Sequence, residues 1–235
     1  MRKYLLHVLI ISFVFLLTPA VSFADAEAEA KRIYKENNNA VVKVTAYDEK
    51  GDEICIGSGF IVKRDGVVVT NYHVIGMARD IKVKAGDKVF DVEGLIFTDK
   101  ENDLAILKAK AKNMPVVKLG VVGKANVGEN VYVIGNPSGL ENTISVGLLK
   151  GIRKIDKKTE ILRMTAPISP GSSGSPVFNS NGEVIGVVTM FVINETLNSS
   201  ETLNSSFAIS VKLIKNKFSS KSVTAIKDSG LEDYI

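Results

Sequence analysis

Residues 57–75 read GSGFIVKRDGVVVTNYHVI, two short apolar segments separated by the dipeptide Asp65-Gly66. Asp-Gly pairs tolerate positive φ and connect the strands of tight hairpins. A second pair of this kind, Asn181-Gly182, joins PVF (176–178) to EVIGVV (183–188). Both stretches therefore predict antiparallel β-hairpins.

Segments of the same type recur between about residues 40 and 210. They are rich in Val, Ile, Thr, Phe and Tyr, and close turn signals separate them: AVVKVTAY, GSGFIV, VVVTN, IKVK, VFDVEGLIF, DLAILK, NVYVIG, TISVGLLKGI, ILRMTA, PVF and EVIGVVTMF. Such a pattern, without long helical segments between the strands, favours an all-β fold in barrels or a sandwich. The stretch from about 108 to 129 reads as a crossing between two β units with five or six strands each.

Helical patterns occur only near the two ends, over residues 25–37 and 210–219. In the second segment Val211, Ile214 and Phe218 would face inward. Its solvated face would carry Lys212, Lys215, Lys217 and Lys221. We therefore expect a short C-terminal helix.

The first 24 residues, MRKYLLHVLIISFVFLLTPAVSFA, have the pattern of a secretory signal peptide. Two basic residues precede an apolar run, and small residues surround a cleavage site between Ala24 and Asp25. The alternative is an uncleaved membrane anchor, but the apolar run is shorter than the ~20 residues of a spanning helix. We expect a protein exported to the periplasm or secreted, with membrane contact only through an uncleaved signal peptide.

Composition excludes several classes of function. The formal charge is +4, and removing Arg2 and Lys3 leaves +2, too weak a field to indicate nucleic-acid binding. Cys55 is the single cysteine, so no intramolecular disulfide can form. His73 is the only histidine after residue 24, which argues against a zinc site of His and Cys ligands. We expect no metal and no cofactor.

Three polar positions have the residue types of nucleophilic catalysis. His73 is the only side chain after the signal peptide that titrates near neutral pH, although a single histidine is often structural. Asp103 opens the apolar segment DLAILK, where turn residues are also common, and Asp99 is an alternative carboxylate. Residues 169–179, SPGSSGSPVFN, contain four serines and would otherwise be read as a simple turn. The chain order His, Asp, Ser is the one found in chymotrypsin.

Five motifs together resemble the protease domain of HtrA-type serine proteases. They are GSGFIVKRDGVVVTNYHVI (57–75), DLAILK (103–108), GNPSGLENTISVGLLKGIRK (135–154), PGSSGSPVFNSNGEVIGVVT (170–189) and FAIS (207–210). The serine motif also resembles that of bacterial glutamyl endopeptidases. The resemblance implies two antiparallel six-stranded β-barrels of the chymotrypsin type, with the active site in the cleft between them.

Carried over residue by residue, the resemblance makes Ser173 the nucleophile, His73 the general base and Asp103 the carboxylate that orients the base. The backbone N–H groups of Gly171 and Ser173 would form the oxyanion hole. Gly171 suits this role because glycine adopts positive φ at little cost.

The resemblance places the substrate pocket beside the nucleophile. Its walls would be Pro167, Ile168 and Ser169 on one side and Val188, Thr189 and Met190 on the other. No aspartate stands there to favour Lys or Arg, and Val188 occupies the place of the glutamyl endopeptidases' histidine, so we expect a small or apolar preference. The duplicated segment ETLNSSETLNSS (195–206) reads as a surface loop that either gates this pocket or is a tolerated insertion.

The predicted organisation is a signal peptide (1–24), an N-terminal segment (25–39), a first barrel (40–118), a second barrel (119–210) and a C-terminal helix with a tail (211–235). Nothing after residue 215 is long enough for a PDZ domain. HtrA relatives often form trimers through N-terminal segments, which suggests a homotrimer. The predicted function is hydrolysis of unfolded or damaged polypeptides. The alternative is a catalytically silent module that binds unfolded peptides.

Overall fold

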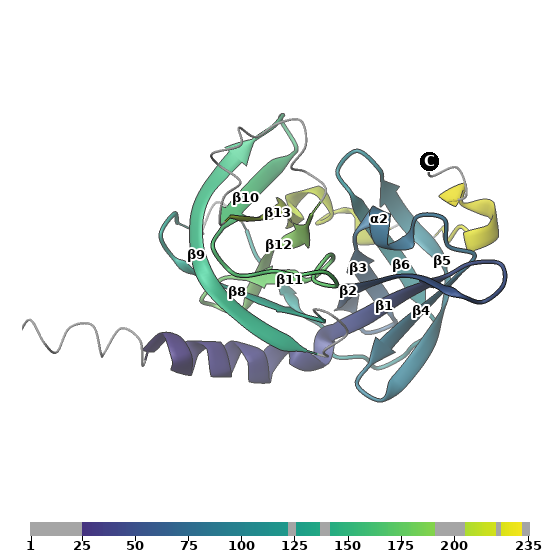
Figure 1. Cartoon of the computed structure of the whole chain (residues 1–235), viewed down its shortest axis with the longest axis horizontal. Helices are drawn as coiled ribbons and strands as arrows, with labels where there is room; N and C mark the ends of the chain where they lie inside the picture. Colours follow the sequence, from purple (N-terminus) through teal and green to yellow (C-terminus); the bar gives the residue numbers. More distant parts are fainter. Residues whose placement is uncertain (1–24, 122–125, 137–141, 191–204, 220–221, 232–235) are drawn as a thin grey trace, which may run out of the picture.

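The strands of the chain close into two β-barrels that lie side by side (Figure 1). The computed structural model describes residues 25–121, 126–136, 142–190, 205–219 and 222–231. In the first barrel the ring order is β1-β2-β3-β6-β5-β4, and β1 pairs with β4. Its strands are β1 (Val41–Tyr47), β2 (Glu53–Lys63), β3 (Val67–Thr70), β4 (Asp80–Ala85), β5 (Lys88–Asp99) and β6 (Leu104–Ala109).

The second barrel has the ring order β11-β8-β9-β10-β13-β12, closed by pairing of β11 with β12. Its strands are β8 (Asn130–Gly135), β9 (Thr143–Lys154), β10 (Glu160–Met164), β11 (Pro176–Phe178), β12 (Glu183–Thr189) and β13 (Ser206–Ser210). The two-residue strand β7 (Lys118–Leu119) adds to β12 in parallel, outside this ring. The predicted pair of six-stranded antiparallel barrels is confirmed.

Both predicted hairpin turns are confirmed by backbone geometry. Gly66 has φ of 89° between β2 and β3, and its N–H donates to the Lys63 carbonyl at 3.1 Å. Gly182 has φ of 72° between β11 and β12, and its N–H donates to the Asn179 carbonyl at 2.9 Å. Glycine adopts this left-handed conformation without a Cβ penalty, so these positions fix where the strands reverse.

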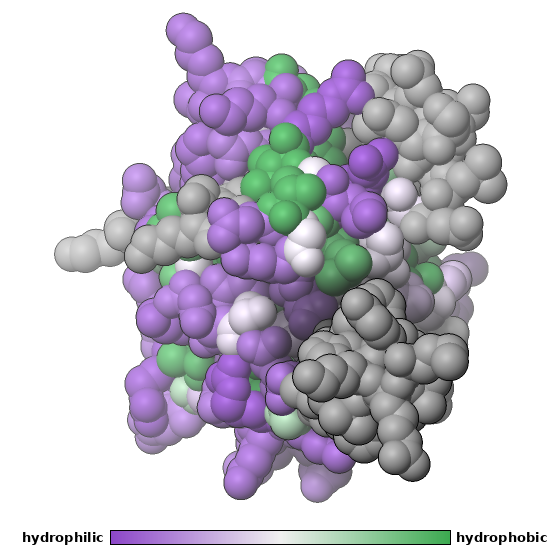
Figure 2. Space-filling model, turned by 90° about the vertical axis from the view of Figure 1, so that its left-hand side faces the viewer, coloured by the Kyte–Doolittle hydropathy of each residue, from purple (hydrophilic) through white to green (hydrophobic). Residues whose placement is uncertain are grey.

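Figure 2 shows the face that lies on the left of Figure 1, where hydrophobic residues gather at the centre of a largely hydrophilic surface. On the outer side of β9, Val146 and Leu148 are each 39% exposed. Between them, a Cβ at Gly147 would lie 2.1 Å from the backbone nitrogen of Ala166. The β9 strand is therefore pressed against the segment after β10, while its outward side chains remain in solvent.

The predicted N-terminal helix is confirmed over residues 25–37 and packs against the second barrel (Figure 1). Its Ile33 is fully buried in a cluster that includes Tyr132 of β8. The Arg32 guanidinium donates to the Ser180 carbonyl at 2.6 Å, in the turn after β11. The Tyr132 hydroxyl donates to the Glu29 carboxylate. Apolar burial and two polar contacts therefore hold the helix on the second barrel, although the first barrel follows it directly in the sequence.

The predicted C-terminal helix is wrong. Residues after β13 form three short 3-10 turns, Val211–Leu213, Lys217–Ser219 and Ile226–Asp228. Val211 and Ile214 do face inward, but the i→i+3 hydrogen bond between them closes a single turn. Tertiary contacts override the local helical pattern here: after the first turn the chain runs from the second barrel to the first and packs there through Thr224, Ile226 and Leu231.

The end of the described chain lies on the first barrel. The backbones of Leu95 and Thr224 exchange hydrogen bonds of 2.7 and 2.8 Å. Ile226 and Leu231 are buried in that barrel's core, and the Met77 N–H donates to the Leu231 carbonyl at 3.0 Å. This segment therefore supports the loop that follows His73.

Two sequence predictions fall outside the described residues: the signal peptide (1–24) and the duplicated segment up to residue 204. Among the described helices, none has the length and hydrophobicity needed to span a membrane.

The contact between Tyr132 and Glu29 predicts a pH-dependent anchor for the helix. Burial and the neighbouring carboxylate raise the pKa of Tyr132 above its ordinary value. Tyr132→Phe is expected to lower the free energy of unfolding by about 1–2 kcal/mol at neutral pH, because the Glu29 carboxylate loses its donor. Urea unfolding of both proteins measures this difference.

The sign of the pH effect follows from the raised pKa. Above about pH 10 the phenol of the unfolded chain ionises while the folded protein keeps its proton. Wild-type stability should therefore fall as pH rises beyond this value, and its advantage over Tyr132→Phe should shrink. An advantage that stays constant or grows at alkaline pH would contradict the assignment.

Candidate active site

His73 lies on a one-turn helix, α2 (Tyr72–Ile75), that directly follows β3. The other three residues of the turn, Tyr72, Val74 and Ile75, are buried in the core of the first barrel. The His73 side chain keeps 13% of its surface exposed. The apolar residues thus anchor the turn and leave the imidazole at the barrel surface.

Asp103 holds His73 through both carboxylate oxygens. Its Oδ2 lies 2.7 Å from the imidazole Nδ1, and its Oδ1 accepts the His73 backbone N–H at 2.9 Å. An ionised carboxylate can only accept hydrogen bonds, so Nδ1 carries a proton and the neutral ring has its lone pair on Nε2. This is the tautomer that a general base requires.

The second barrel also contacts Asp103. The Thr189 hydroxyl, at the end of β12, donates to Asp103 Oδ2 at 2.6 Å. The Asn71 side chain donates to the Asp103 carbonyl at 2.8 Å. Asp103 has φ of 51°, a left-handed conformation that Asp tolerates better than most residues. The carboxylate is therefore fixed from its backbone and from both of its oxygens.

Asp99, the alternative carboxylate, has different partners. Its two oxygens accept the backbone N–H and the side-chain amide of Asn102 at 3.0 and 2.9 Å. The His73 ring and the His73 backbone N–H donate to Asp103 instead. Geometry therefore pairs His73 with Asp103.

The predicted nucleophile follows a tight turn at Ser169-Pro170-Gly171-Ser172. The Ser172 N–H donates to the Ser169 carbonyl at 2.9 Å, and Gly171 has φ of 91°. Proline at the second position and a positive φ at the third are the marks of a type II turn. Among the hydrogen bonds of the described residues, none uses the N–H of Gly171 or Ser173. Both donors can therefore serve a bound group.

Residues 169–175, which carry Ser173 and are called the serine loop below, approach the first barrel closely at Gly174. This glycine has φ of 86°, and a Cβ there would lie 2.0 Å from the Ser58 carbonyl oxygen. On the other side its N–H donates to the Val188 carbonyl at 3.0 Å, and the Val188 N–H donates to the Ser175 carbonyl at 2.9 Å. The loop is thus enclosed between β2 and β12.

The serine loop and α2, which carries His73, both contact Gly57 of β2. A Cβ at this position would lie 2.6 Å from a Val74 methyl and 3.0 Å from the Ser173 carbonyl oxygen. Val74 is the neighbour of His73 on α2. The fold therefore brings the predicted base, carboxylate and nucleophile to the junction of the two barrels.

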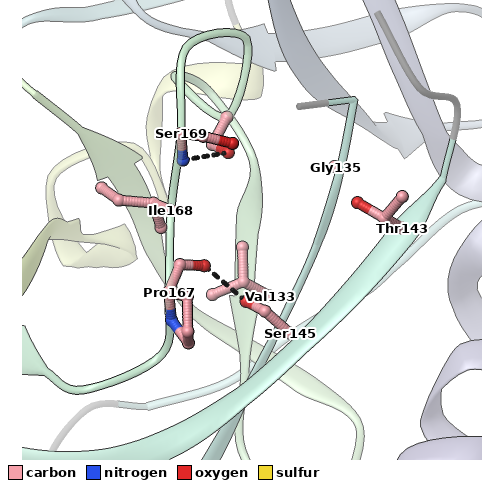
Figure 3. A pocket seen from close by; sticks show the side chains of 8 residues that line it. Val133, Gly135, Thr143, Ser145, Pro167, Ile168 and Ser169 are labelled. Atoms are coloured by element: carbon pink, nitrogen blue, oxygen red, sulfur yellow. Dashed lines mark hydrogen bonds between the residues drawn. The ribbon is translucent and has the colours of Figure 1, made fainter. Parts of the chain in front are cut away.

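Three of the predicted pocket residues, Pro167, Ile168 and Ser169, line a cavity of about 180 Å³ (Figure 3). Its other walls come from β8, β9 and the serine loop: Val133, Gly135, Thr143, Ser145 and Ser172. The Ser145 hydroxyl donates to the Pro167 carbonyl at 2.8 Å and so fixes this wall.

The other three predicted pocket residues lie outside this cavity. Val188 and Thr189 are fully buried, and Met190 is 44% exposed. The Thr189 hydroxyl donates its hydrogen bond to Asp103 and not to the cavity. Within the described part of the chain, the six residues therefore do not surround one common cavity.

Cys55, the single thiol, is half-buried on β2. Burial raises the pKa of this thiol above its ordinary value. The thiolate, which is the reactive form, is therefore disfavoured at neutral pH.

Two polar residues of the site, Ser58 and Asn136, were given no role by the sequence interpretation. The Ser58 hydroxyl donates to the Gly171 carbonyl at 2.7 Å, and the Asn136 N–H donates to the Ser58 hydroxyl at 2.9 Å. Ser58 lies in the motif GSGF and Asn136 in the motif GNPSG, both shared with the HtrA-type domains, and these motifs are the sequence signal that could have indicated a role.

Comparison with known proteins agrees with this geometry. Residues 57–187, more than half of the chain, match the family described as trypsin-like peptidase domain. The chain belongs to the trypsin-like peptidase family. This trypsin-like peptidase is 38% identical over 143 residues to a probable periplasmic serine endoprotease DegP-like of Pseudomonas putida (strain W619), covering 60% of the chain and 30% of the relative. The resemblance to HtrA-type protease domains is confirmed.

Other relatives carry different names. The putative serine protease HhoB of Synechocystis is 40% identical over 141 residues, covering 57% of the chain and 34% of the relative. The anti-sigma-I factor RsgI9 of Acetivibrio thermocellus is 37% identical over 161 residues, covering 68% and 22%. The trypsin-like peptidase chain thus spans 22–34% of the length of these curated relatives.

The fold is also found in a crystal structure, that of the serine endoprotease from Yersinia pestis. The TM-score is 0.65 at 29% sequence identity, and the match covers 79% of this trypsin-like peptidase and 63% of that chain.

The pairing of His73 with Asp103 rather than Asp99 predicts unequal effects of two matched substitutions. Asp103→Asn should lower kcat on a peptide substrate about 10⁴-fold, because the amide would favour the wrong imidazole tautomer. Asn also tolerates the left-handed backbone, so the fold should be retained. Asp99→Asn should change kcat little. Steady-state kinetics and near-UV circular dichroism check both variants, and a severe loss only in Asp99→Asn would overturn the pairing.

Proposed function

We propose that this trypsin-like peptidase is a serine endopeptidase that acts through Ser173, His73 and Asp103. The observation that carries the proposal is the two-point contact between Asp103 and His73, at 2.7 and 2.9 Å, beside the Ser173 loop. A serine hydroxyl is a weak nucleophile until a neighbouring base takes its proton, and this contact prepares the base.

In the proposed mechanism, Ser173 Oγ attacks the carbonyl carbon of the scissile peptide bond while His73 Nε2 takes the serine proton. The tetrahedral intermediate collapses to an acyl-enzyme, and His73 gives the proton to the leaving amine. A water molecule, deprotonated by His73, then attacks the acyl-enzyme; the bond to Ser173 Oγ breaks, His73 returns the proton to Oγ, and the carboxylate product leaves. Asp103 stays ionised and stabilises the imidazolium in both steps.

The N–H groups of Gly171 and Ser173 would bind the oxyanion of each tetrahedral intermediate. Two features support this role: the positive φ of Gly171 in its type II turn, and the availability of both donors among the described residues. Loss of one such donor in a serine protease typically lowers kcat about 10²–10³-fold.

We propose unfolded or damaged polypeptides in the periplasm or outside the cell as substrates. Support comes from relatives named as periplasmic DegP-like serine endoproteases. A small or apolar side chain is proposed for the residue before the cleaved bond, since Pro167, Ile168 and Ser169 bring no charge to the cavity. A homotrimer formed through residues 25–39 is a further proposal that rests on the family resemblance.

A second candidate function is a catalytically silent module that binds unfolded peptides. One relative that shares 37% identity with the chain is named an anti-sigma factor rather than a peptidase. A related domain therefore occurs in a protein whose name describes regulation, which favours testing this candidate directly.

The two candidates differ in their response to Ser173→Ala. The chain from residue 25 should degrade casein and should be labelled by a serine-directed phosphonate, because the phosphonate reacts only with an activated hydroxyl. Ser173→Ala should lose both properties while keeping its circular dichroism spectrum. Equal cleavage by both proteins would point to a contaminating protease. Casein binding without cleavage or labelling in the wild type would favour the silent module.

A further inference from the structure

Ser58 of β2 contacts the serine loop at two points across the barrel junction. Its N–H donates to the Ser173 carbonyl at 2.7 Å, and its hydroxyl donates to the Gly171 carbonyl at 2.7 Å. Gly171 and Ser173 are the two residues whose N–H groups we assign to the oxyanion hole. One fully buried residue of the first barrel thus holds the carbonyl group of each.

Asn136 fixes the direction in which the Ser58 hydroxyl donates. The Asn136 backbone N–H approaches Ser58 Oγ at 2.9 Å and its side-chain amide at 3.3 Å, both as donors. A hydroxyl has a single proton, so with donors on this side the proton is directed to the Gly171 carbonyl. Asn136 is itself held, since its amide also donates to the Val42 carbonyl at 3.0 Å.

The Gly171–Ser172 peptide is consequently fixed at both polar groups. Its carbonyl accepts from Ser58 and its N–H donates to the Ser169 carbonyl at 2.9 Å. The Gly171 N–H belongs to the preceding peptide, Pro170–Gly171. The φ and ψ angles of Gly171 set the orientation of that peptide relative to the fixed Gly171–Ser172 peptide. Because glycine has wide conformational freedom, a free Gly171–Ser172 peptide would let this N–H change direction.

We propose that Ser58 is a positioning residue for the oxyanion hole, with its hydroxyl fixing the Gly171 donor and its backbone N–H fixing the Ser173 donor. The inference rests on the proposed function, because it assigns a catalytic consequence to the position of these two donors. It concerns the transition state: binding of an uncleaved peptide uses other contacts, whereas a developing oxyanion requires both N–H groups in place.

Ser58→Ala tests the proposal, because it removes the hydroxyl and leaves the backbone N–H. We expect kcat on a peptide amide to fall about 10–100-fold, less than for complete loss of a donor, with little change in KM. Affinity for a peptidyl trifluoromethyl ketone, which forms a tetrahedral oxyanion with the serine, should fall in parallel. Affinity for a non-electrophilic peptide of the same sequence should not change.

Ser210→Ala is the matched control. Ser210 is equally buried, and its hydroxyl accepts the Lys212 N–H at 3.2 Å where β13 ends and the next 3-10 turn begins. This variant should keep wild-type kcat and the wild-type ratio of the two inhibitor affinities. If Ser58→Ala does not fold, Ser58→Cys replaces it, since the thiol retains a weak donor and should give a smaller loss of the same kind.

The outcomes separate this inference from the proposed function. A wild-type protein that neither cleaves nor reacts with phosphonate overturns the proposed function, and this inference with it. An active wild type with Ser58→Ala indistinguishable from Ser210→Ala overturns only the role of Ser58. A Ser58→Ala variant that loses affinity for both inhibitors equally has a general structural defect, which also overturns the positioning role.

Discussion

One carboxylate oxygen joins the two barrels at the centre of the site. Oδ2 of Asp103 accepts hydrogen bonds from His73 in the first barrel and from Thr189 in the second. A charge with this little solvent exposure is costly unless hydrogen bonds replace its water, and here three of them reach the two oxygens. The orientation of His73 therefore depends on how the barrels sit against each other.

The serine loop depends on the same junction. It belongs to the second barrel by sequence, yet Ser58 of the first barrel holds two of its carbonyl groups. Apolar packing also joins the barrels: one buried cluster contains Phe60 from the first barrel together with Tyr132 and Phe178 from the second. Close packing of this kind resists small displacements. The barrels thus provide a rigid frame in which the polar groups keep their distances.

The sequence predicted much of this arrangement because its strongest signals are local. Asp65-Gly66 and Asn181-Gly182 reverse the chain wherever they occur between apolar strands, and so the hairpins could be read directly. The prediction of a C-terminal helix was wrong because Val211 and Ile214 satisfy a helical pattern over one turn only. After that turn the chain is held by contacts with the first barrel. The α2 turn of four residues is too short to give a periodic signal.

In the site, too, local sequence signals were readable and contacts between distant residues were not. His73, Asp103 and Ser173 were predicted as site residues from residue type, chain order and the family motifs, and in the structure these residues lie at the junction of the two barrels. Thr189 was predicted to line the pocket, but its hydroxyl contacts Asp103, 86 residues earlier in the chain. Ser58 and Gly171 are 113 residues apart. Contacts at such separations depend on the relative placement of the barrels, which no local pattern encodes.

The docking of the N-terminal helix has a consequence for the order of folding. Glu29 and Arg32 find their partners 103 and 148 residues later in the chain, whereas all strands of the first barrel are complete by Ala109. Contacts distant in sequence form late, because closing a long loop costs entropy before any contact is gained. The helix, which precedes both barrels in the sequence, is thus among the last elements to be packed. Its apolar face, centred on Ile33, stays exposed to solvent until the second barrel has formed, which favours association of partly folded chains over that interval.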